Sequence, residues 1–129
     1  DYVNTSQVTV GDTIAPTISV THSPNNPTNA QQITLNAVAS DLNTGNSGIS
    51  KIQIYVDGSV KQICTFSPIC TLATCTCATT PQTYSTGTHT YYATVVDNAP
   101  TPNIGTYPLS GTTSFNVSII STSGLWVSA

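Results

Sequence analysis

Residues 48–58 read GISKIQIYVDG, and their apolar and polar side chains alternate. The apolar side chains that fall on one face are Ile52, Ile54 and Val56. A period of two is that of a β-strand with one buried face. The stretch ends in Asp57-Gly58, a dipeptide typical of a two-residue hairpin turn, and SVKQICTF follows at 59–66. We therefore predict a β-hairpin in this part of the chain.

The same alternation recurs on both sides of the hairpin, in segments separated by clusters of Pro, Gly and Asn. Further strands are predicted at 17–22, 32–40, 74–79, 88–96 and 112–120, and long loops at 40–48 and 97–111. The side chains expected to face the core in three of these strands are Ile18, Val20, His22, Ile33, Leu35, Ala37, Ala39, Phe115, Val117 and Ile119. The number of strands, their period and the spacing of the turns predict an all-β, two-sheet Greek-key sandwich of about seven strands.

The composition agrees with a single β domain. Ser and Thr supply 39 of the 129 residues and Asn another ten, whereas Glu, Arg and Met are absent. β-Branched residues favour strands, and the residues that favour helices are scarce. Because apolar residues reach 38% and the net charge is only −3, the composition is not that of a disordered chain.

The charge content bears on partners and environment. Lys51 and Lys61 are the only cations, so nucleic acid and anionic membranes are unsuitable partners. No apolar run has the length of a transmembrane helix. Because the chain lacks Met, we expect that Asp1 is not a translational start, and that a leader was removed or the chain is part of a longer protein. An extracellular or cell-surface location is predicted.

Four cysteines lie within the segment CTFSPICTLATCTC, at Cys64, Cys70, Cys75 and Cys77. An even, closely grouped set in an apparently secreted chain indicates two disulfides, while their spacing differs from the paired knuckles of structural zinc sites. Three connectivities are possible. We favour the nested one, Cys64 with Cys77 and Cys70 with Cys75, which would staple a hairpin, because bridging the two cysteines on one strand face would strain the bond.

Four segments resemble the Ig-like or fibronectin-III-like domains of bacterial and archaeal surface proteins. They read DTIAPTISVTHSP, ASD, GISKIQIYVDG and GTHTYYATVVDNA, and the resemblance covers roughly residues 12–120. It implies the sandwich fold, whereas its implications for function are broad, because such domains serve as spacers, adhesins and filament subunits. Where the family pattern has the first Tyr of G-x-Y-x-Y-x-A, this chain has His89, so we expect His89 to be a packed, hydrogen-bonded corner residue.

The two ends extend beyond the sandwich, which we place at 12–122. Residues 1–11 form a strand-like stretch, whose candidate strand-donor residues are Tyr2, Val3, Val8 and Val10. A detached strand needs backbone partners, and an open sheet edge needs a strand. Insertion of this strand into the next copy satisfies both and propagates head to tail. The alternatives are a strand of its own domain or a linker. The tail 123–129 carries Trp126, which is expected to cap the domain or cover a neighbouring subunit.

Other candidate sites are few. Asn4 and Asn116 begin N-x-[ST] sequons, and Asn116 is predicted to point outward because its neighbours face the core. The chain has no Glu, no G-x-S-x-G and no H-E-x-x-H, so we predict neither an enzyme nor a cofactor. Asp41 and Asp97 each follow a strand. Their loops, with Asn43 and Asn98, could surround calcium, but loop-capping is the favoured interpretation and no metal ligand is predicted.

These features favour a structural subunit of an extracellular surface filament. The arrangement is similar to archaeal extracellular threads and other donor-strand filaments, whose subunits are single, glycosylated, Thr-rich Ig-like domains. The expected partner is a second copy of the chain, with surface glycans or other cells as further candidates. The alternative is an adhesion or spacer module of a larger surface protein. A carbohydrate-binding module would need an exposed aromatic platform, for which the candidates are Tyr55, Tyr84, Tyr92 and Tyr107.

Overall fold

A computed structural model describes residues 11–120 of the chain. Eight β-strands form the fold: β1 (Thr17–Ser23), β2 (Thr34–Ser40), β3 (Ile49–Val56), β4 (Ser59–Cys70), β5 (Cys75–Ala78), β6 (Gly87–Asp97), β7 (Ile104–Tyr107) and β8 (Thr113–Val117). The predicted strand-donor residues and the first sequon, which lie in residues 1–10, and Trp126 in the tail fall outside the described residues.

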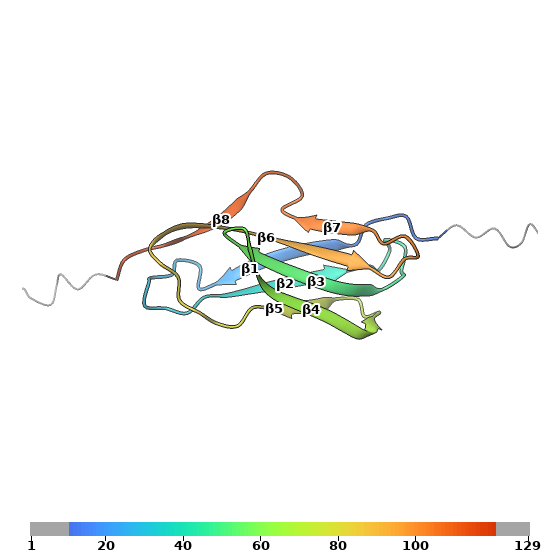
Figure 1. The fold of residues 1–129 in the computed structure, drawn as a ribbon, viewed down its shortest axis with the longest axis horizontal. Helices are drawn as coiled ribbons and strands as arrows, with labels where there is room; N and C mark the ends of the chain where they lie inside the picture. Colours follow the sequence, from blue (N-terminus) through green and yellow to red (C-terminus); the bar gives the residue numbers. More distant parts are fainter. Residues whose placement is uncertain (1–10, 121–129) are drawn as a thin grey trace, which may run out of the picture.

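The strands form two antiparallel sheets that face each other (Figure 1). The smaller sheet has the order β1-β2-β5, and the larger has the order β4-β3-β6-β7, with β8 also paired to β6. Two stacked antiparallel sheets, between which the chain crosses, form the predicted Ig-like sandwich. The fold class predicted from the sequence is therefore confirmed.

The hydrophobic core lies between the sheets because alternate residues of β2, β3 and β6 point inward. The register keeps this alternation: Ile52 pairs with Val95 and Ile54 with Ala93 across β3 and β6, and all four side chains are fully buried. The remaining core residues include Val20, Ile33, Leu35, Ala37, Ala39, Phe115 and Val117. The inward set predicted from the period is thus correct except at its last member.

That exception is Ile119, which is 72% exposed. The strand β8 ends at Val117, and the chain then pairs in parallel with Thr28 through Ser118. The alternation of side chains therefore no longer governs residue 119. The prediction that Ile119 faces the core was wrong because the strand is shorter than the apolar pattern.

The predicted loop at 97–111 contains a strand, β7, that the sequence did not indicate. Both β7 and β8 pair with the same edge of the 11-residue strand β6, one along each half. Residues 108–112 leave the sheet between them. The last strand of the sandwich is thus divided in two, which raises the number of strands from about seven to eight.

The two lateral sides of the sandwich are built differently. On one side, two disulfides join β4 of the larger sheet to the short strand β5 of the smaller sheet. On the other side, β7 approaches the start of β1 without a covalent link: a Cβ added to Gly105 would lie 2.2 Å from the carbonyl oxygen of Pro16. Only glycine allows the two backbones to approach so closely.

Candidate functional site

The corner between β3 and β6 is held by His89, as the departure from the family's Tyr suggested. Its Nδ1 lies 2.6 Å from Oδ2 of Asp57, and its Nε2 lies 2.7 Å from the carbonyl oxygen of Ser85. Both partners are acceptors in their usual states, so both ring nitrogens must donate, which is the property of the imidazolium. The backbone N–H of Thr90 donates to the other oxygen of Asp57.

The electrostatics of the pair follow from this geometry. Burial lowers the pKa of His89, but the hydrogen bonds to Asp57 and Ser85 and the charge of Asp57 outweigh it, so the pKa lies above its ordinary value. The hydrogen bond from His89 is the largest factor that holds the pKa of Asp57 below its ordinary value. The pair ties the hairpin turn to β6 and offers no nucleophile. It is a structural element.

A cluster of three carboxylates lies at the end of the sandwich where β1 begins and β2 and β6 end. Oxygens of Asp12, Asp41 and Asp97 all lie within 4.8 Å of one another. Asp41 and Asp97 are buried, with 3% and 1% exposed. The sequence indicated the two buried members because each follows a strand. It did not indicate Asp12, which approaches them from the segment before β1 and lies directly over Gly45, at which a Cβ would overlap its carboxylate.

Hydrogen bonds from the chain occupy most oxygens of these carboxylates. The Asp41 carboxylate accepts from the Gly48 backbone N–H at 2.8 Å and from the Thr44 hydroxyl. The Ser47 hydroxyl lies between Asp12 and Asp41, and its single proton goes to Asp12, the nearer of the two, whose pKa this hydrogen bond does most to lower.

The third member of the cluster organises the loop after β6. The Asp97 carboxylate accepts from the backbone N–H groups of Ala99 and Asn103, and from the Asn103 side-chain amide at 2.8 Å. Of the two asparagines named as further calcium ligands, Asn43 donates its backbone N–H to the Asn46 side chain and Asn98 donates its own to the Gly48 carbonyl. Carboxylate oxygens suit a hard cation such as Ca²⁺, and each member offers one. The hydrogen bonds show that all three organise the surrounding loops.

The four cysteines form Cys64–Cys77 and Cys70–Cys75, with Cα–Cα distances of 5.9 and 6.3 Å. These separations are within the range usual for disulfides. Cys75 and Cys77 are both buried on the core side of β5, facing β4. The two disulfides thus have the nested pairing that the sequence analysis favoured, and each of them joins the larger sheet to the smaller one.

The second sequon begins at Asn116, whose side chain is exposed on β8. Its neighbours Phe115 and Val117 are buried, and the Asn116 side chain points outward, as the alternation along the strand predicted. The Thr88 hydroxyl lies 3.2 Å from the Asn116 side-chain oxygen.

The four tyrosines considered for an aromatic platform do not form one. Tyr84 is buried, with 8% exposed, and contacts His89 and Phe115 in the core, while Tyr107 packs partly against the core. Tyr55 and Tyr92, which are paired across β3 and β6, stack on each other with ring centroids 4.4 Å apart and planes 8° apart. Their rings therefore stand beside one another and are not spread as a flat surface.

A groove runs along the open side of the sandwich, between the start of β1 and β7. It measures about 480 Å³ and is lined by residues 15–18 and 104–109. Ile104 is 59% exposed and Leu109 88% exposed. No charged residue lines it.

The comparisons with known proteins agree with this architecture. Residues 16–93, which run from the start of β1 into β6, match the family described as the bacterial Ig domain. The chain belongs to this family. No curated protein and no solved structure matches this Ig domain.

Bacterial Ig domains are typical of cell-surface proteins and are generally structural modules without catalytic activity. The two disulfides of this Ig domain fit a secreted or surface protein. Within residues 11–120, no helix has the length and apolar character needed to cross a membrane.

Proposed function

We propose that this Ig domain is a structural subunit of an extracellular filament, in which residues 1–11 of one copy pair as a strand with the next copy. The single observation that carries the proposal is the unguarded edge of β1 beside an apolar groove. An exposed strand edge with unpaired N–H and C=O groups is a template for another strand.

The edges of the two sheets are not equally available. The edge strand β4 carries Lys61 and Pro68, two features that discourage pairing with another chain. The edge strand β5 has four residues, and both of its cysteines are bonded to β4. By contrast, β1 has seven residues with neither a charge nor a proline. The other edge of the larger sheet is formed by β7 and β8, of four and five residues, so β1 is the longest described edge strand with neither a charge nor a proline.

The groove beside β1 supplies the apolar contacts that a donated strand needs. The start of β1 and β7 line it, and it offers Ile18, Ile104 and Leu109 to apolar side chains of an added strand. Alternate residues of such a strand face the groove, and its backbone pairs with β1. Tyr2, Val8 and Val10 of the donor share one parity and are the side chains we assign to the groove, with Val3 on the other face.

The ends of the domain suit a linear assembly. The first described segment and the last described segment lie at opposite ends of the long axis (Figure 1). About ten extended residues span about 30 Å. A head-to-tail contact of this kind is not closed by symmetry and repeats into a filament.

Deletion of residues 1–11 tests the donor. The intact chain should form filaments visible by negative-stain electron microscopy, and the deleted chain should remain a monomer by size-exclusion chromatography with light scattering. A far-ultraviolet circular dichroism spectrum of β type in the deleted chain shows that the domain still folds. An intact chain that stays monomeric at high concentration would contradict the proposal and favour an adhesion or spacer module.

A pair of matched substitutions tests the groove. Ile104→Lys places a charge in the groove and should abolish filaments, because burying an unpaired ammonium group is costly. Ile63→Lys on β4 changes an equally apolar side chain that is 49% exposed and lies outside the groove, and should leave filaments intact. Equal behaviour of the two variants would exclude this groove as the acceptor.

Glycosylation is a further part of the proposal. Asn116 is exposed, and a glycan there would help to keep a nearly uncharged surface soluble. Treatment of native material with an N-glycosidase should reduce its mass, and the site should be found at Asn116 by peptide mass spectrometry. Asn4 begins the second sequon, but it shares the parity of Tyr2, Val8 and Val10, so a glycan there would oppose insertion of the donor strand. An unmodified Asn116 in native material would remove the glycan from the proposal and leave the assembly untouched.

A further inference from the structure

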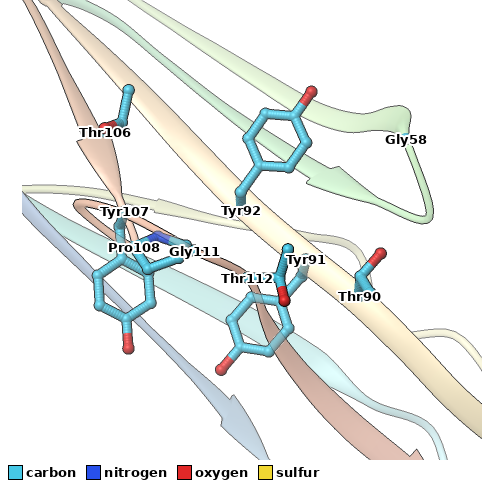
Figure 2. A pocket seen from close by; sticks show the side chains of 9 residues that line it. All are labelled: Gly58, Thr90, Tyr91, Tyr92, Thr106, Tyr107, Pro108, Gly111 and Thr112. Atoms are coloured by element: carbon cyan, nitrogen blue, oxygen red, sulfur yellow. The ribbon is translucent and has the colours of Figure 1, made fainter.

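The division of the last strand leaves a hollow over the middle of β6. It measures about 320 Å³ and lies between the hairpin turn after β3 and the segment that links β7 to β8. Its lining consists of Gly58, Thr90, Tyr91, Tyr92, Thr106, Tyr107, Pro108, Gly111 and Thr112 (Figure 2). Its volume falls at the lower end of the range of ligand pockets, about 300 to 1,000 Å³.

The ring of Tyr92 is one wall of the hollow. Figure 2 shows this ring on one face of β6, while the rings of Tyr91 and Tyr107 project to the opposite face. Tyr55 stacks on one side of the Tyr92 ring, with 8° between the planes. The 40% of Tyr92 that is exposed therefore belongs to the other side and the edge of the ring. Tyr55 fixes the ring upright, so its free face is presented in one orientation.

The polar groups of the hollow are neutral. None of its nine lining residues is charged, and six of them carry hydroxyl groups, namely three threonines (Thr90, Thr106 and Thr112) and three tyrosines. A hydroxyl both donates and accepts a hydrogen bond. The neighbouring Asp57 is occupied by His89 and the Thr90 amide. The site therefore combines a rigid aromatic face with uncharged donors and acceptors.

We propose that this hollow binds one ring of a neutral saccharide. A pyranose has an apolar C–H face, which matches the free face of Tyr92, and a rim of hydroxyls, which matches the threonine hydroxyls. A charged ligand finds no counter-charge in the lining. A peptide strand would require a row of unpaired edge groups, whereas β7 and β8 pair with this edge of β6 on both sides of Tyr92. A neutral sugar satisfies both the apolar and the polar part of the site.

The sugar has two possible sources, and the same chemistry serves both. One is a glycan of another molecule. The other is a glycan on Asn116 of the same chain, because Asn116 pairs with Thr88 on β8 and β6, four residues from Tyr92. Four residues of a strand span about 13 Å, which the second or third sugar of a glycan can reach.

Saturation-transfer difference NMR tests the proposal, because it detects weak ligands on monomers and on large assemblies alike. The full chain, made in a host without N-glycosylation, is mixed with neutral hexose and pentose oligosaccharides, and with oligogalacturonate as the charged counterpart. We expect transfer to the C–H protons of one neutral sugar ring, with a Kd of about 1 mM. Tyr92→Ala should weaken binding at least about tenfold, and Tyr92→Phe should retain it. Ile63→Ala, on the outer face of the same sheet, should have no effect.

The outcomes separate the sources and the alternatives. Binding to the glycosylated and the unglycosylated chain alike supports a glycan from another molecule. Binding to glycosylated chain that appears only after enzymatic removal of the glycan supports the chain's own glycan as occupant. Absence of transfer from every neutral sugar, preference for the charged one, or equal binding by Tyr92→Ala would overturn the proposal. None of these results depends on filament formation, so this test and that of the assembly fail independently.

Discussion

The Nδ1 atom of His89 lies 2.6 Å from Oδ2 of Asp57 and joins the turn after β3 to the start of β6. In related sandwiches a Tyr hydroxyl at this place bonds to the backbone a few residues upstream. Here Nε2 makes that bond, to the carbonyl of Ser85 four residues earlier. The second ring nitrogen adds a charged partner, which a Tyr cannot do. The corner therefore depends on pH.

The pH dependence of stability has a defined sign. The pKa of His89 is raised from 6.5, so its contribution is complete below pH 6.5 and is lost as the pH rises through the higher folded-state value. The pKa of Asp57 is lowered from 3.8, so its contribution is complete above pH 3.8 and is lost as the pH falls through the lower value. The pair should stabilise the domain most between pH 3.8 and 6.5.

Urea unfolding of the wild type and Asp57→Asn across pH 3 to 9 (a range of about six units) checks this expectation. Half of the Asp57 side chain is exposed, at 49%, so the pH-dependent difference in unfolding free energy should be no more than about 1 kcal/mol. The variant also weakens the hydrogen bond from the Thr90 amide, and this loss of stability does not vary with pH. A difference that is constant from acid to alkaline pH would show that the ion pair contributes nothing.

The two disulfides should differ in their contribution to stability. Cys64–Cys77 closes a loop of 13 residues and Cys70–Cys75 a loop of 5. In the chain-entropy account, the longer loop restricts the unfolded chain more, which gives about 3 kcal/mol against about 2 kcal/mol. The pairs of Cys→Ala substitutions, compared by chemical unfolding, should follow this order. The reverse order would indicate that restriction of the unfolded chain does not decide how much each disulfide contributes.

Gly105 should tolerate no side chain. A Cβ there would lie 2.2 Å from the Pro16 carbonyl oxygen and 3.0 Å from Cγ1 of Val95, so Gly105→Ala must push β7 away from β1. We expect a loss of about 1–3 kcal/mol, the usual effect of overpacking. Gly11→Ala is the control, because its added Cβ has no neighbour closer than 3.9 Å, and it should change stability by less than about 0.5 kcal/mol. Similar unfolding midpoints for both variants would contradict the close contact of β1 and β7.

Asp97→Asn tests the balance within the carboxylate cluster. The amide would place a donor where the carboxylate accepts from Asn103, and one donor would lose its partner. We expect a loss of about 1–3 kcal/mol at neutral pH. The unfolding free energy is measured in EDTA, so that no divalent cation contributes. If repulsion among the three carboxylates outweighs these hydrogen bonds, the variant will instead be more stable than the wild type.

The local pattern was sufficient for the fold class. The alternation at Ile52, Ile54 and Val56 and the Asp57-Gly58 turn predict one hairpin, and the same period elsewhere predicts two stacked sheets. Burial of one face is a property of each strand by itself, so the alternation of neighbouring residues is enough to predict it. The outward direction of Asn116 follows for the same reason. The strand β7 was not predicted, because four residues with an exposed first position carry almost no pattern.

The sites arose only from tertiary structure, because they join residues that the chain keeps far apart. Asp12 meets Asp97 across 85 positions, and no local period relates them. Tyr55 and Tyr92 meet because β3 lies beside β6, and the register of that pairing is set by burial in the core and not by either tyrosine. The strand period therefore decides which way each side chain points, while the packing of the two sheets decides what it meets.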